Sequence, residues 1–305
     1  MKVGNCYFRI ADFNIRIIFN DTRVNNRRLI ASYAPFERDA ADDLLLTLTV
    51  DDSLPVKHKE ERRRIDRTDT GNGVTVIDSI NGGGYQFIIK NNAGYECCLL
   101  QTDAAYRDFH CALNGNDDMR RFGLNNALMI VFMMASCAHD TVMIHASLVR
   151  HGGYGYAFTA SSGTGKSTHT GLWMRTIEGC DLMNDDNPVI RIIDGQPVVY
   201  GTPWSGKTPC YRQTHAPLGA VTRIDRSAEN SIERLPVVKA FASLLPSFSL
   251  MRWDPYIFNN VCKTIIRLVE CDMAYILHCR PDEEAALICH RAISRQKPSP
   301  CPTPH

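Results

Sequence analysis

Apolar and polar residues alternate with a period of two through most of the first third of the chain. Residues 6–110 contain several such segments, with glycine-rich turns at 71–73 and 82–84. Alternation of this kind places apolar side chains on one face of a β-strand, and glycine-rich turns separate successive strands. The clearest segments are residues 13–17, 46–50, 74–76 and 85–89. The pattern predicts a mainly-β N-terminal region, in which no motif indicates a chemical activity.

The pattern changes at residues 117–139, where apolar residues recur at helical spacing. The apolar stripe consists of Leu124, Leu128, Val131 and Ala135. Spacing of three and four residues gathers side chains on one face of an α-helix. Met133 and Met134 lie beside this stripe. We interpret the methionine-containing face as hydrophobic core rather than as a cofactor-binding surface.

Short strands and helices follow one another in the second half of the chain. The patterns predict strands at 142–144, at 154–159 and ending near Asp185, and helices at 167–177, 236–247, 257–270 and 282–295. This succession is typical of an α/β domain. We therefore predict an α/β domain with a mixed sheet at 119–295 and a smaller, mainly-β domain at 1–118. The proline-rich tail, residues 296–305, is expected to be irregular.

Composition narrows the classes of partner. The 305 residues carry a formal net charge of +1, with 44% hydrophobic and 22% charged residues, which is ordinary for a globular protein. The densest basic stretch, residues 57–67, is interrupted by acids, so we interpret it as a solvated loop rather than a nucleic-acid-binding surface. The longest apolar run, residues 127–138, is too short for a transmembrane helix. We expect neither nucleic acid nor a membrane as partner.

Cysteine usage bears on the cellular compartment. The chain has 12 cysteines, several of them beside apolar residues, and its first residues form no charged-then-apolar leader. Chains of this length without a secretory leader usually keep free thiols. We expect a cytoplasmic protein whose cysteines pack as small apolar side chains.

A glycine-rich loop lies between a predicted strand and a predicted helix. Ala160, four further residues and then Gly165-Lys166-Ser167 match the pattern G-x-x-x-x-G-K-[ST], with alanine at the first position. Such a loop directs backbone N–H groups at phosphate oxygens, its lysine reaches the β- and γ-phosphates, and its hydroxyl meets Mg²⁺. The expected nucleotide-binding residues are Ser162, Gly163, Thr164, Gly165, Lys166, Ser167 and Thr168. The loop predicts a site for ATP and Mg²⁺.

Two adjacent acids, Asp185 and Asp186, follow at the end of the next predicted strand. Neighbouring side chains point to opposite faces along a strand, but both can turn toward a site where the strand ends. One carboxylate would then hold Mg²⁺, and the other would accept the proton of an attacking hydroxyl. The alternative is a solvated Asp-Asp-Asn turn. The phosphate loop that precedes these acids favours the first interpretation.

Three stretches in a fixed order resemble the fold group of HPr kinase/phosphorylase and phosphoenolpyruvate carboxykinase. They are "IHASLV" at 144–149, "SSGTGKST" at 161–168 and "NDD" at 184–186. Residues 200–207, "YGTPWSGK", also look like a stretch of compact HPr-kinase-like proteins. The resemblance covers residues 140–215. It implies a P-loop core with a mixed sheet, like the C-terminal domain of HPr kinase.

The resemblance also implies a role for each matching residue. Lys166 would contact the β- and γ-phosphates, and Ser167 and Asp186 would bind Mg²⁺. Asp185 would be the general base toward a substrate hydroxyl, as in the HPr kinases. His145 would lie at the edge of the site, where it binds a transition metal, positions phosphate or simply ends a strand.

Two further residues, Lys207 and Asn187, bear on the predicted reaction. Lys207 is the candidate for a second cation over the transferring phosphate, with an exposed loop lysine as the alternative. Asn187 stands where carboxykinases carry an acid, so we expect no carboxykinase activity. We predict an ATP- and Mg²⁺-dependent kinase that transfers the γ-phosphoryl group to a hydroxyl on a protein serine or a small molecule. The alternatives are an ATP-binding sensor that does not transfer and a plain ATPase. The resemblance is compatible with a homo-oligomer and sets no number of subunits.

Overall fold

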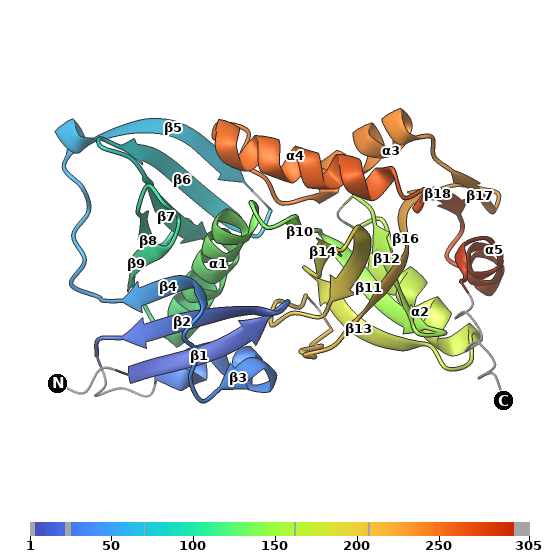
Figure 1. Ribbon diagram of the computed structural model, residues 1–305, viewed down its shortest axis with the longest axis horizontal. Coiled ribbons are helices and arrows are strands. Elements are labelled where there is room, and N and C mark those ends of the chain that lie inside the picture. The colour runs from blue at the N-terminus through green and yellow to red at the C-terminus, as the bar shows by residue number, and fades with distance from the viewer. Residues whose placement is uncertain (1–3, 22–25, 70, 162, 207, 296–305) are drawn as a thin grey trace, which may run out of the picture. The chain divides into compact units, whose positions relative to one another are not determined.

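A computed structural model describes residues 4–21, 26–69, 71–161, 163–206 and 208–295. The chain forms two compact units, each built on a mixed β-sheet (Figure 1). The first unit comprises residues 1–139 and 250–259, and the second comprises residues 140–249 and 260–305. The fold class is α/β with mixed sheets, as the sequence predicted.

A mixed sheet forms most of the first unit. Its elements are β1 (Gly4–Ile10), β2 (Phe13–Phe19), η1 (Asn26–Phe36), β3 (Glu37–Arg38), β4 (Leu44–Val50), η2 (Lys59–Glu61), β5 (Arg62–Asp69), β6 (Gly73–Ile80), β7 (Tyr85–Asn91), β8 (Glu96–Thr102) and β9 (Asp108–Leu113), where η marks a 3-10 helix. The strand order is β3-β1-β2-β4-β9-β8-β7-β6-β5. β4 runs parallel to both β2 and β9. The period-two segments of the sequence therefore form strands, and Ile15, Ile17 and Leu48 turn into the core.

Helix α1 (Asp117–Ser136) packs on the strands β4, β7, β8 and β9 of this sheet. The side chain of Asn116 caps the helix by accepting a hydrogen bond from the N–H of Met119 at 3.1 Å. Gly123 lets the helix approach β8 closely, because an added Cβ would lie 2.7 Å from the carbonyl oxygen of Cys97. The predicted stripe faces the core through Leu124, Leu128 and Val131. The first unit consequently extends to His139, beyond residue 118, where the sequence placed the domain boundary.

One buried carboxylate holds the segment 250–259 in the first unit. Asp254 accepts hydrogen bonds from the hydroxyls of Tyr85 at 2.7 Å and Tyr106 at 2.5 Å. It also accepts one from the N–H of Ile257 at 2.9 Å. Burial, together with the bond to Asp254, raises the pKa of Tyr85 to about 12. The phenol therefore stays protonated at neutral pH and remains a donor.

The second unit alternates strands and helices. Its elements are β10 (Thr141–Met143), β11 (Ala146–His151), β12 (Tyr154–Thr159), α2 (Lys166–Thr176), β13 (Asp181–Asp186), β14 (Val189–Ile193), β15 (Gln196–Tyr200), β16 (His215–Arg226), β17 (Ser231–Arg234), α3 (Val237–Leu244), η3 (Leu245–Ser247), the greater part of α4 (Pro255–Val269), β18 (Ala274–Cys279) and α5 (Glu283–Ile293). The strand order is β10-β14-β15-β16-β12-β11-β13, and β18 pairs with β16 and β17. β16 runs parallel to β12 and to β18.

The core of the second unit lies between this sheet and two helices. Helix α2 packs on β11, β12 and β13 and against α5. Phe158 of β12, Trp173 of α2 and Cys289 of α5 are fully buried together. Cys98 and Cys111 of the first unit are likewise buried free thiols, which agrees with the apolar surroundings predicted for the cysteines. Among the described residues, no helix has both the length and the apolar run that crossing a membrane requires.

Candidate functional site

The glycine-rich loop joins the end of β12 to the first turn of α2, as the sequence predicted. Gly163 and Gly165 have φ values of 76° and 125°, which only glycine adopts without strain. A hydrogen bond of 3.1 Å from the N–H of Thr164 to the carbonyl oxygen of Ser161 closes a turn inside the loop. The first N–H groups of α2 have no acceptor within the helix, and the helix dipole makes this end positive. The loop and helix can therefore hold an anion. Ser162 lies outside the described residues.

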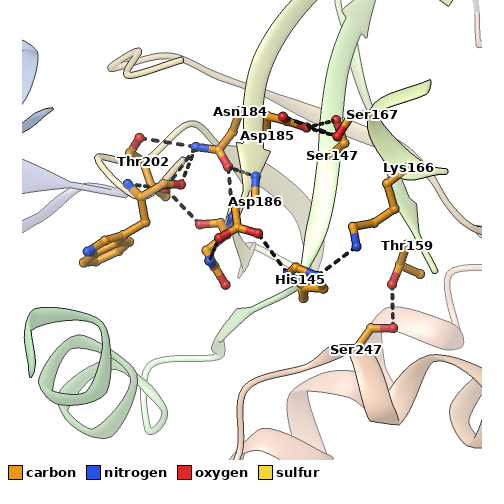
Figure 2. Close-up of polar contacts among 12 residues, drawn as sticks. His145, Ser147, Thr159, Lys166, Ser167, Asn184, Asp185, Asp186, Thr202 and Ser247 are labelled. Atoms are coloured by element: carbon orange, nitrogen blue, oxygen red, sulfur yellow. Dashed lines mark hydrogen bonds and ion pairs between the residues drawn. The ribbon is translucent and has the colours of Figure 1, made fainter. Parts of the chain in front are cut away.

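Lys166, His145 and Asp186 form a continuous chain of polar contacts (Figure 2). The Nζ atom of Lys166 lies 2.8 Å from Nε2 of His145, and Nδ1 of His145 lies 3.1 Å from Oδ1 of Asp186. An ammonium group can only donate, so Nε2 is the acceptor and Nδ1 carries the proton toward Asp186. The backbone N–H of His145 is fixed by the carbonyl oxygen of Ser247 at 2.7 Å. This chain holds a cation at the mouth of the loop.

Burial lowers the pKa of Lys166, while the negative charges of Asp186 and then Asp185 oppose that effect. The net lowering of the pKa therefore reflects burial of the ammonium group, which outweighs its attraction to the two carboxylates. A bound polyphosphate would add further negative charge. It would therefore favour the protonated form of Lys166 that such a ligand requires.

Asp185 is the buried acid of the pair, with 5% of its surface exposed. Its Oδ1 atom accepts hydrogen bonds from the hydroxyls of Ser147 at 2.7 Å and Ser167 at 3.1 Å. Its Oδ2 atom accepts one from the N–H of Thr208 at 3.3 Å. The resemblance paired Ser167 with Asp186, whereas the structure brings Ser167 to Asp185. Asp186 lies instead against His145, with 32% of its side chain exposed.

A fully buried amide, Asn184, holds the end of β13 in place (Figure 2). Its Nδ2 group donates to Thr202, at 3.1 Å to Oγ1, and to the carbonyl oxygen of Trp204, also at 3.1 Å. Its Oδ1 atom accepts from the N–H groups of Asp186 and Asn187, both at 3.1 Å. One side chain thereby ties the end of β13, where the two acids lie, to Thr202 and Trp204.

The loop that contains Thr202 and Trp204 packs against the acid pair without room for a side chain at Gly206. The N–H of Gly206 donates to the carbonyl oxygen of Asp185 at 2.9 Å, and an added Cβ would lie 2.7 Å from the same oxygen. Trp204 is buried, with 2% exposed. Lys207, the candidate second cation, lies outside the described residues.

Three residues that hold this site together were not identified from the sequence as functional. Ser147 lies within the quoted "IHASLV" stretch and Asn184 within "NDD", but neither motif indicates which side chains meet. Arg226, at the end of β16, donates to the carbonyl oxygens of Gly163 at 2.6 Å and Thr164 at 3.2 Å. No signal in the sequence predicts the Arg226 contact, because it joins residues far apart along the chain.

The side chains at this site suit a hard divalent cation. Ser167, Asp185 and Asp186 offer a hydroxyl and two carboxylates, and Mg²⁺ binds oxygen ligands while it keeps several waters. Within the ranges that the structure describes, no group of three or more His, Cys, Asp or Glu side chains is arranged to hold a metal.

His169, in the second turn of α2, supplies a pH-dependent contribution to stability. Its Nε2 atom accepts a hydrogen bond from Nε1 of Trp173 at 3.1 Å, and its ring lies edge-on to Phe158. Burial lowers the pKa of His169 to about 4, whereas an unfolded histidine titrates near pH 6.5. The unfolded chain therefore binds more protons between these values, and the free energy of unfolding falls as the pH falls below about 6.5.

We expect wild-type protein to lose about 2 kcal/mol more stability between pH 7 and pH 5 than a His169→Gln variant loses. Glutamine removes the titration and can still accept from Trp173. Urea unfolding at the two pH values measures both losses. Equal losses in the two proteins would show that His169 is not the group that titrates.

Comparisons with known proteins identify no family for this chain. No family model matches the sequence, and no curated protein matches it. Among solved structures, the HPr(Ser) kinase/phosphatase from Coxiella burnetii is similar at 12% sequence identity over 30% of this chain and 77% of that chain, with a TM-score of 0.24. A likeness this slight carries no argument about the reaction.

Proposed function

We propose that this protein is an ATP- and Mg²⁺-dependent phosphotransferase of the HPr-kinase-like type, with a P-loop core. It would transfer the γ-phosphoryl group to a hydroxyl on a protein serine or a small molecule. The observation that supports this most is the joining of the glycine-rich loop to both acids, through the Ser167–Asp185 contact and the Lys166–His145–Asp186 chain. A loop that only bound phosphate would need no second, exposed acid.

The contacts support a definite division of labour between the acids. Asp185 is buried and already accepts from Ser167, so it is suited to hold Mg²⁺ together with that hydroxyl. Asp186 is one-third exposed, so an acceptor hydroxyl can reach it. We therefore assign the metal to Ser167 and Asp185 and the general base to Asp186, which reverses the roles that the resemblance implied for the two acids.

Phosphoryl transfer in this arrangement needs few groups from the protein. The acceptor oxygen attacks the γ-phosphorus, the bond to the β-phosphate oxygen breaks, and ADP leaves. Asp186 takes the hydroxyl proton, while His145 orients its carboxylate. Lys166 stabilises the negative charge on the transferring group. When bound, Mg²⁺ neutralises charge on the phosphate oxygens.

The first test requires no knowledge of the acceptor. ATP with Mg²⁺ at about 100 times its dissociation constant should stabilise the wild-type protein by roughly 2.7 kcal/mol, which raises its melting temperature by a few degrees. Lys166→Ala should abolish this shift. Lys239→Ala, an exposed lysine of the same unit, should keep it.

No shift in wild-type protein at millimolar ATP would refute the nucleotide site. A shift without release of ADP over a broad panel of hydroxyl acceptors would favour an ATP sensor instead of a transferase. The panel should include serine-containing peptides and polyhydroxylated metabolites, since both kinds of acceptor fit the proposed reaction. The proposed use of ATP is consistent with the cytoplasmic location expected from the cysteines.

A further inference from the structure

The glycine-rich loop borders a cavity on the side away from the acid pair. The strand before the loop, β12, has β11 and then β13 on one side and β16 and then β18 on the other. The acids lie at the end of β13. The cavity lies over the ends of β16 and β18 and has a volume of about 510 Å³. Binding sites for small ligands usually have volumes of roughly 300–1,000 Å³.

The walls of this cavity combine an apolar surface with a polar rim. Leu172 and Ile224, both buried, contribute the apolar part. Gly163 of the glycine-rich loop and Thr168 of the first turn of α2 line one edge of the cavity. Arg280, which directly follows β18, lines another part of it. A phosphate group alone would not use the apolar wall. The lining suits a flat, mainly apolar group that continues into an anion at the loop.

We infer that this cavity holds the nucleoside of the bound nucleotide, with the base stacked on Arg280. The inference rests on the proposed function and adds to it the location of the base and ribose. The loop sets the direction of the phosphates, because Lys166 and Ser167 reach the β- and γ-phosphates on the side of the acids. The α-phosphate then lies nearest Thr168, at the edge of the cavity.

Arg280 is suited to stacking because its charge is already offset. Its Nε atom donates to Asp282 at 2.9 Å, and its Nη2 atom donates to Glu284 at 3.1 Å. Two carboxylates therefore hold the guanidinium plane in place, and planar guanidinium groups stack on aromatic rings. Arg226 differs, since it donates to the carbonyl oxygens of Gly163 and Thr164. It keeps its positive charge near the expected α-phosphate.

The cavity is poorly placed for the phosphoryl acceptor. An acceptor hydroxyl must reach the γ-phosphorus beside Lys166 and Asp186, and the loop separates those residues from the cavity. His169, which also lines the cavity, has its buried Nδ1 atom without a hydrogen-bond partner among the described residues. Nδ1 carries the proton, because Nε2 accepts from Trp173. A polar ligand in the cavity could supply the missing acceptor.

The test compares ATP with inorganic tripolyphosphate, both with Mg²⁺, by isothermal titration calorimetry. Wild-type protein should bind ATP at least ten-fold more tightly than tripolyphosphate, since only ATP fills the cavity. Arg280→Ala should remove most of that preference and leave the affinity for tripolyphosphate unchanged. Ser227→Trp, which places a large side chain on the cavity wall, should do the same by a different route. Arg291→Ala, an exposed arginine elsewhere in the unit, is the matched control.

The outcomes separate this inference from the proposed function. If wild-type protein binds both ligands equally, or if both folded variants keep the preference for ATP, the nucleoside does not lie in this cavity, while the phosphate site stands. If wild-type protein binds neither ligand, the proposed function is wrong and the inference is wrong with it. Melting temperatures of the variants show that each is folded before it is titrated.

Discussion

Asp186→Asn should retain binding of Mg²⁺ and ATP but form ADP at least about 100-fold more slowly than wild-type protein, because loss of a general base typically costs 10²–10⁴ in rate. Asp185→Asn should act differently and weaken the Mg²⁺-dependent part of ATP binding. The two variants change adjacent residues in the same way. Because both substitutions replace a carboxylate with an amide, any difference between the variants shows that the two carboxylates have different places in the site.

The expected difference follows from exposure and hydrogen bonding. Asp185 is buried, and its oxygens accept from Ser147, Ser167 and Thr208. In the proposed reaction, this burial keeps a substrate hydroxyl from Asp185, whereas a cation bound at Ser167 would share its carboxylate. Asp186 has 32% of its side chain exposed. Its contact with Nδ1 of His145 leaves part of this carboxylate exposed, as the proposed role of general base requires.

Calorimetric titration with ATP, with and without Mg²⁺, and the initial rate of ADP formation measure the two effects separately. Asp194→Asn is a suitable control, because Asp194 lies in an exposed turn with φ of 51°, which asparagine also tolerates. The opposite result, with turnover lost in Asp185→Asn at unchanged Mg²⁺ dependence, would restore the roles that the resemblance implied. Wild-type rates in both variants would contradict any base in this pair.

The sequence alone predicted the local arrangement around the loop accurately. β12 covers the predicted residues 154–159, and α2 begins within one residue of the predicted helix. Glycines, small residues and the start of a helix at fixed spacing are all local signals. Each depends on near neighbours in the chain, so each can be identified without tertiary contacts.

Pairing across strands could not be predicted in the same way. β11 runs antiparallel to β13 with Ser147 opposite Asp185, and the register shifts between Leu148 and Val149. A shift of one residue exchanges the faces of a strand. The register therefore decides which acid lies opposite Ser147, and it is set by contacts distant in sequence. Motif spacing could place both acids near the loop but could not distinguish their roles.

Two features of the first unit also depend on contacts that the sequence pattern does not predict. The 3-10 helix η1 contains Pro35 and carries the buried residues Leu29, Tyr33 and Phe36, in a stretch where the sequence predicted only a mainly-β region. Helix α1 was predicted correctly as a helix, yet its partner was not. Its Gly123 packs against Cys97 of β8, and the pattern of apolar residues along the chain does not predict that contact.

The buried amide of Asn184 should contribute more to stability than its size suggests. Asn184→Ala should lower the free energy of unfolding by about 4 kcal/mol, since it leaves carbonyl oxygens at Thr202 and Trp204 and N–H groups at Asp186 and Asn187 without this fully buried partner. Urea unfolding measures the loss. Because the same contacts hold the two acids, the variant should also bind Mg²⁺ and ATP more weakly at temperatures where it is folded.

Asn230→Ala is a matched control that separates burial from the number of bonds. Asn230 also makes several hydrogen bonds, to Asp282, Glu284 and the N–H of Arg280, but it is only partly buried. Water can replace those bonds, so the expected loss is about 1 kcal/mol. Equal losses in the two variants would mean that Asn184 acts by bond number alone. A much larger loss in Asn184→Ala would instead show that the end of β13 depends on one desolvated amide, because water cannot reach the groups that the substitution leaves behind.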